Sequence, residues 1–255
     1  MTHWVRFERQ GQTCLGVLEG DSIAVHDGDL FGQTTATGLS VPLAEVTLLP
    51  PCVPSKMVCL WNNSRSAAEK LKLAEPAEPL YFFKAPTAFL PSGQIIPRPP
   101  SYPGRVLFEG ELGVVIGKRC AHVSEAEADA FIFGYTCVND VTAFELLNKD
   151  PSFPQWARAK SFDGFAPFGP AIATGLDPDG LIIRSLLDGR ERQNYPVSDM
   201  FFSPRRLVSL ISQDITLLPG DIISCGTSLG PAPMKPGARI EVVIDGIGTL
   251  GNVMG

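Results

Sequence analysis

Short apolar or alternating runs dominate the chain, and glycine, proline and aspartate separate them. Runs of four to eight such residues between turn formers are typical of β-strands. They predict strands within 4–8, 14–20, 22–28, 41–50, 56–61, 106–117, 135–140, 171–175, 181–189, 221–228 and 239–250. Helical spacing of apolar residues is confined to 64–75, 124–134 and 203–212. We therefore expect a β-rich α+β fold with few helices.

A proline-rich stretch divides the chain near residue 50. Residues 48–56 read LLPPCVPSK, with three prolines, and follow a series of short hairpin-like strands. Such a stretch breaks both helices and strands. We predict a small N-terminal β domain over 1–50 and a larger domain over 51–255. Within the larger domain, Ser66 and Glu69 have the spacing of a helical capping box.

Composition excludes several classes of function. The chain has 255 residues, of which 44% are hydrophobic, so it can build a sizeable core with a small appended domain. Its formal net charge is −6, and no Lys/Arg cluster alternates with aromatic residues, so we expect no nucleic-acid partner. An anionic substrate would need a local positive group on this acidic background.

Targeting signals and paired cysteines are not evident. No apolar run approaches the roughly 20 residues of a spanning helix, and the start MTHWVRFERQ does not read as a signal peptide. The six cysteines are scattered and form no C-x-x-C pair. We therefore expect no membrane partner and a cytoplasmic, reducing location.

The strongest chemical signal is a group of three carboxylates. Glu109 and Glu111 alternate along the predicted strand 106–117 and therefore point to one face of it. Asp140 closes another predicted strand. Buried carboxylates repel one another unless a proton, a base or a cation compensates them, and all-oxygen ligation favours Mg²⁺ over Mn²⁺ or Ca²⁺. From spacing alone, a solvated strand face with a turn aspartate is an equal alternative.

Several motifs in order resemble the fumarylacetoacetate hydrolase family over roughly 51–255. They are EGELGVVIG from Glu109, GYTCVND ending at Asp140, AKSFD containing Lys160, APFGP at 166–170, LPGD at 218–221 and GT at 226–227. The resemblance implies a mixed β-sandwich roll, a homodimer, and a Mg²⁺ (or Mn²⁺) site at the three carboxylates. It also implies that Lys160 faces the substrate and that Thr227, beside Gly226, binds the substrate carboxylate.

The chain also departs from the family pattern. Hydrolytic members usually carry N-Y-x-x-H after the first core strand, but this chain reads WNNSRSAAE there and has no histidine. Its three histidines, His3, His26 and His122, lie elsewhere. Phe144 and Leu147 stand where members often have Arg and Gln. In these features the chain is more similar to the homoprotocatechuate-pathway decarboxylase/isomerase branch.

Further candidate residues each have a structural alternative. Lys160 could hold the substrate carboxylate or shuttle a proton, or it could simply pair with Asp163 or with one of the metal-ligand carboxylates. Glu69 could replace the missing base, although the capping box explains it equally well. Arg65 could bind a distal carboxylate or remain solvent-exposed at a helix start. Without the resemblance, Thr227 reads as an ordinary turn residue.

The missing histidine decides between reactions. Hydrolysis of an acylpyruvate needs a water and a base, and losing the base costs ~10²–10⁴-fold in rate. Decarboxylation or keto-enol isomerisation of a small 2-oxo (di)carboxylic acid needs only a metal-stabilised enolate. We predict the latter, with a C–C bond hydrolase as the alternative. A catalytically silent, metal-stabilised binding protein is a third hypothesis.

Overall fold

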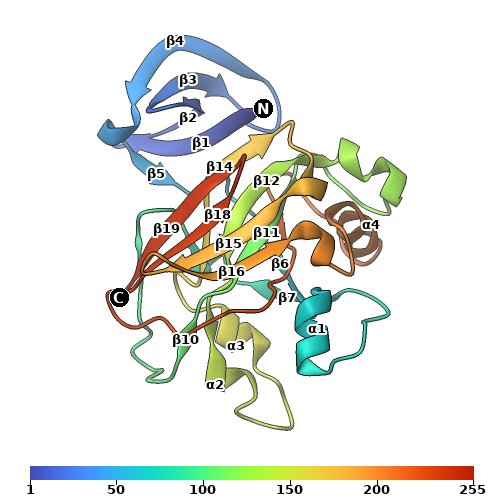
Figure 1. Ribbon diagram of the computed structural model, residues 1–255. Helices are drawn as coiled ribbons and strands as arrows, with labels where there is room; N and C mark the ends of the chain where they lie inside the picture. Colours follow the sequence, from blue (N-terminus) through green and yellow to red (C-terminus); the bar gives the residue numbers. More distant parts are fainter.

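The computed structural model describes residues 1–255 and consists mainly of β-strands (Figure 1). The strands are β1 (Thr2–Arg9), β2 (Gln12–Glu19), β3 (Ser22–Gly28), β4 (Thr34–Pro42), β5 (Thr47–Leu49), β6 (Met57–Trp61), β7 (Leu80–Lys84), β8 (Phe89–Leu90), β9 (Ile95–Ile96), β10 (Val106–Leu107), β11 (Gly110–Ile116), β12 (Ile132–Asn139), β13 (Thr142–Ala143), β14 (Ala166–Thr174), β15 (Ile182–Leu187), β16 (Arg190–Pro196), β17 (Ile222–Ser224), β18 (Arg239–Ile244) and β19 (Gly248–Met254). The α-helices are α1 (Arg65–Leu71), α2 (Phe144–Leu147), α3 (Trp156–Lys160) and α4 (Pro204–Asp214). None of these helices combines the length and the apolar character needed to cross a bilayer.

Two sheets pack face to face. The larger sheet has the order β4-β3-β2-β1-β14-β12-β11-β17-β6-β7, and the smaller one has the order β16-β15-β18-β19-β9. Leu112, Val114 and Ile116 of β11 are fully buried in one cluster with side chains of β15 and β18. Because side chains alternate along a strand, Glu111 projects from the opposite face of β11. The strand is thus buried on both faces, one apolar and one carrying a carboxylate.

The N-terminal strands form a small sheet domain that continues the larger sheet. β1 to β4 run as an antiparallel meander, and β1 pairs with β14 of the main domain. This unit has its own apolar cluster of Val5, Phe7, Ile23, Val25 and Val41, joined by Ala171 of β14. The predicted fold class, a β-rich sandwich roll with a small N-terminal β domain, is confirmed.

The structure corrects three local predictions. The strand predicted over 106–117 is interrupted at 108–109, so Glu109 precedes β11 rather than lying within a continuous strand. The helix predicted over 124–134 is only a 3-10 turn over Glu125–Ala130, and β12 follows it at once. Helix α1 is capped by Ser64, whose hydroxyl accepts the Ala67 N–H at 3.1 Å. Ser66 therefore lies inside the helix, and Glu69 is not its capping partner.

Candidate metal centre

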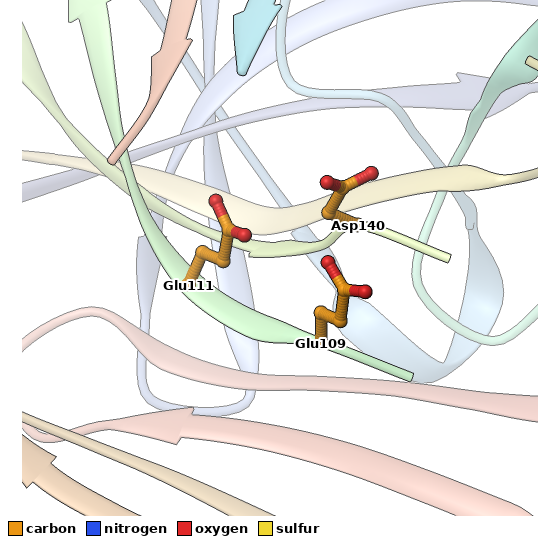
Figure 2. Close-up of side chains that lie close together, drawn as sticks. All are labelled: Glu109, Glu111 and Asp140. Atoms are coloured by element: carbon orange, nitrogen blue, oxygen red, sulfur yellow. The ribbon is translucent and has the colours of Figure 1, made fainter. Parts of the chain in front are cut away.

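The three predicted carboxylates converge at the ends of two neighbouring strands. β11 and β12 pair antiparallel with Gly110 opposite Asn139, which brings Glu109 next to Asp140. The backbone N–H of Asp140 donates to the Glu109 carbonyl at 2.8 Å. One ligand oxygen from each of Glu109, Glu111 and Asp140 lies within 4.8 Å of the others, and Figure 2 shows the carboxylates facing a common space.

The Glu111 side chain is buried, and only one of its two carboxylate oxygens is hydrogen-bonded. One of its oxygens, Oε2, accepts hydrogen bonds from the Ser224 hydroxyl at 2.5 Å and the Gly226 N–H at 2.9 Å. The other oxygen, Oε1, is buried and has no hydrogen-bond partner. Burial, followed by the charges of Asp140 and Glu109, raises the pKa of Glu111 to about 8. A carboxylate held in this state needs a proton or a cation.

Lysines compensate the other two acids. The Lys160 Nζ lies 2.6 Å from both Glu109 Oε2 and Asp140 Oδ2, and the buried Lys84 ammonium bonds Asp140 Oδ1. Burial alone would raise the pKa of Asp140, but the charges of Lys160 and Lys84 outweigh it and lower that pKa. Burial raises the pKa of Glu109, although Lys160 opposes the rise.

Lys160 is held as a cation. Burial would lower the pKa of its ammonium, but the charges and hydrogen bonds of Asp140 and Glu109 raise it further than burial lowers it. Of the two structural alternatives considered for Lys160, the ion pair with a metal-ligand carboxylate is present, whereas Asp163 is exposed and makes no ion pair with Lys160. Lys84 was missed by the sequence interpretation; the available signal was a lone lysine ending the aromatic strand LYFFK.

These residues fit a divalent cation. When all of them are ionised, three carboxylates and two ammonium groups carry one net negative charge. The partnerless Oε1 of Glu111 is an orphaned buried acceptor, which costs free energy unless something binds it. An all-oxygen donor set suits a hard cation such as Mg²⁺ or Mn²⁺. The cation would leave a positive centre able to attract an organic anion.

A cavity of about 240 Å³ opens beside the carboxylates. Of the predicted site residues, Glu109, Lys160 and Thr227 line it. Gly226 instead contacts the carboxylate group through its N–H bond to Glu111. Its φ of 93° is a conformation that other residues rarely adopt, and an added Cβ would lie 3.2 Å from Asn63 Cβ, so this turn favours glycine.

Glu69 and Arg65 are not brought into this cavity. Both are exposed on α1, and neither is among the residues that line the cavity. The Arg65 guanidinium lies 4.7 Å above the Phe201 ring and 3.9 Å from Glu75. Exposure at the helix start was the structural alternative considered for Arg65, and it describes this arrangement.

The Thr227 hydroxyl is engaged within the protein. It donates to the Gly110 carbonyl at 3.1 Å and accepts from the Gln193 amide at 2.8 Å. No hydrogen bond within the chain uses the Thr227 backbone N–H, which is therefore the group left for a ligand. Gln193 also accepts the Gly110 N–H at 2.9 Å, so β16 fixes both the turn and the start of β11. The sequence carried no sign of this role for Gln193.

Comparisons with known proteins agree with this architecture. The family described as fumarylacetoacetate (FAA) hydrolase C-terminal matches residues 56–254, and the family described as Rv2993c-like, N-terminal matches residues 2–51. The oxaloacetate tautomerase YisK of Bacillus subtilis is 35% identical over 258 residues, covering 94% of this chain and 85% of that protein.

Solved structures share the whole fold. A 2-hydroxyhepta-2,4-diene-1,7-dioate isomerase from Mycobacterium marinum superposes with a TM-score of 0.90 at 36% identity, covering 100% of this chain and 98% of that one. A maleylpyruvate hydrolase from Sphingobium, bound to manganese(II) and pyruvate, superposes with a TM-score of 0.78 at 25% identity over 99% of both chains. This chain belongs to the fumarylacetoacetate hydrolase family of enzymes.

Proposed function

We propose that this enzyme binds Mg²⁺ or Mn²⁺ at Glu109, Glu111 and Asp140 and isomerises or decarboxylates a small 2-oxo acid. The observation that carries the proposal is the convergence of three carboxylates, one with a buried, partnerless oxygen, beside a cavity. The tautomerase and isomerase relatives support the same class of reaction. The prediction of Lys160 as a catalytic residue is retained.

The bound cation would polarise the 2-oxo group and so favour loss of a proton or of CO₂ from the neighbouring carbon. Lys160 is the only cationic residue lining the cavity, and it would hold the substrate carboxylate. The Thr227 N–H would donate a second hydrogen bond to it. Isomerisation then moves one proton between C3 and the 2-oxygen. Decarboxylation breaks the C3–C4 bond, releases CO₂ and leaves C3 to take a proton from water.

Hydrolysis finds less support in this cavity. It requires a base within hydrogen-bond reach of the attacking water. None of the histidines lines the cavity, and Glu69 is exposed outside it. Isomerisation and decarboxylation do not need an activated water, so the lack of a histidine or of Glu69 in the cavity does not count against them.

Oxaloacetate is the substrate used to test the proposed function. Conversion of its enol to the keto form is monitored by ultraviolet absorbance and CO₂ release by a coupled assay, with Mg²⁺, Mn²⁺ or EDTA. We expect metal-dependent acceleration of one of these reactions and its loss in EDTA. Glu69→Gln serves as a control and should retain the wild-type rate.

Two outcomes would overturn the proposal. Rapid cleavage of fumarylpyruvate that Glu69→Gln abolishes would establish the hydrolase alternative. Metal-dependent stabilisation without turnover of any 2-oxo acid tested would favour the silent binding protein.

We also propose that the enzyme forms a homodimer through the aromatic groove beside β7. β7 is the last strand of the large sheet and pairs only with β6. Trp61, Leu80, Phe83 and Phe153 are exposed there and line a groove of about 900 Å³. An unpaired edge strand with exposed aromatic residues is suited to pairing with a second copy.

The cytoplasmic location also remains a prediction, supported by six free cysteines.

Light scattering after gel filtration tests this dimer. The wild type should elute at twice the mass of one chain, whereas Phe83→Glu should shift it toward a monomer because a charge enters the apolar groove. Ile182→Glu, at an exposed residue of β15 that does not line this groove, is the matched control and should stay dimeric. A monomeric wild type at micromolar concentration would contradict the proposal.

A further inference from the structure

Exposed apolar side chains gather around the mouth of the catalytic cavity. Leu71, Leu73, Phe144 and Leu229 are each between 40% and 58% exposed, and all four line this cavity. They come from α1 and its following loop, α2, and the loop after β17. Large exposed apolar side chains that collect around a hollow mark a binding site for an apolar group.

Charge is confined to the other end of the cavity. Glu109 and Lys160 are the only charged residues that line it, and they lie 2.6 Å apart at the metal centre. Arg65, the candidate for holding a second carboxylate, lies outside the lining with its guanidinium over Phe201. A carboxylate placed among the apolar residues would lose its hydration without gaining a partner.

We propose that the substrate of this enzyme carries an apolar alkyl or aryl group beyond its 2-oxo acid head. The inference rests on the proposed function, because it assumes that the head lies at the metal centre. It narrows the predicted 2-oxo (di)carboxylic acid class. A second carboxylate of the substrate is accommodated only within the substrate's first four carbons, near Lys160, and not farther from the 2-oxo acid head.

N-substituted oxamates test the inference by binding, independently of turnover. Oxamate presents the same carboxylate and carbonyl as a 2-oxo acid but cannot enolise. N-isobutyl oxamate and N-carboxymethyl oxamate differ by two methyl groups in place of two carboxylate oxygens. Calorimetry with the Mg²⁺-loaded protein should show the isobutyl compound binding roughly tenfold or more tightly, because two methyl groups leave water.

Variants at the mouth should reverse the preference. Leu229→Arg places a cation beside the distal group and should favour N-carboxymethyl oxamate over N-isobutyl oxamate. Leu73→Arg is a second variant at the same mouth, in case the first fails to fold. Leu39→Arg, at an exposed leucine of β4 in the N-terminal domain, is the matched control and should leave the wild-type ratio unchanged.

The outcomes separate this inference from the proposed function. If the wild type bound the two oxamates equally, or bound the carboxymethyl compound more tightly, the inference of an apolar substituent would be wrong. The proposed metal chemistry would be unaffected. Failure of both oxamates, and of oxalate, to bind the Mg²⁺-loaded protein would overturn the proposed function itself.

Discussion

Glu111→Gln is expected to reduce metal-dependent turnover by roughly 10³-fold or more, since the cation supplies several kcal/mol of charge stabilisation. The glutamine carbonyl can still accept the bonds from Ser224 and Gly226 that Oε2 accepts now. The amide nitrogen would then replace the partnerless Oε1 and present a donor where the cation needs an acceptor. The substitution therefore removes metal affinity and keeps the shape of the side chain.

Thermal unfolding separates this effect from misfolding. At 100 times its dissociation constant, a cation stabilises the wild type by about 2.7 kcal/mol, and this increment should disappear in Glu111→Gln. Glu125→Gln, at an exposed glutamate, is the matched control and should keep both the increment and the activity. A Glu111→Gln protein that binds Mg²⁺ as the wild type does would exclude Glu111 as a ligand.

The pH dependence of the metal-free protein provides a further readout of the same substitution. The pKa of Glu111 is raised to about 8 from an ordinary value of 4.5, so folding favours its protonated form. Its contribution to stability is therefore present at low pH and is lost as the pH rises toward 8. In EDTA, the wild type should lose stability across this interval, and Glu111→Gln should lose less.

The fold and the carboxylate cluster could be predicted because their signals are local. Alternation predicts that Glu109 and Glu111 point the same way, and both reach the centre although Glu109 itself precedes β11; the surrounding apolar residues indicate that the strand is buried. Lys84 and Gln193 could not be found in this way. Each reaches the site from a strand that is distant in sequence, and only the pairing of β7 and the position of β16 bring them there.

Helix α1 shows how the positions of Arg65 and Glu69 depend on distant contacts. Its start depends on Ser64, whose hydroxyl also donates to Asp199 Oδ2 at 2.5 Å, a residue 135 positions away. With that start, Ala67 and Leu71, four residues apart, face the cavity. Arg65 and Glu69, also four apart, lie on another face of the helix and are exposed. Asp199, far away in the sequence, anchors the start of this helix and so helps to fix its position.

Replacing Lys84 by methionine is expected mainly to lower stability, whereas replacing Lys160 by methionine is expected mainly to lower activity. Lys84 is fully buried and bonds Asp140, so Lys84→Met leaves part of a buried charge without compensation. Breaking a buried pair from one side costs about 3–5 kcal/mol. Lys160 lines the cavity, so Lys160→Met should instead reduce turnover and raise KM, while Lys84 still compensates Asp140.

Urea unfolding with EDTA and with Mg²⁺, together with steady-state kinetics, distinguishes these roles. Lys84→Met should lose about 3 kcal/mol of unfolding free energy in EDTA and recover part of it with Mg²⁺, because the cation then compensates the carboxylates. Lys160→Met should lose less stability and more activity. Lys70→Met, at an exposed lysine of α1, is the control and should change neither quantity. If Lys84→Met were as stable as the wild type in EDTA, Asp140 could not depend on Lys84. If Lys160→Met kept its KM, the substrate carboxylate would have to bind elsewhere.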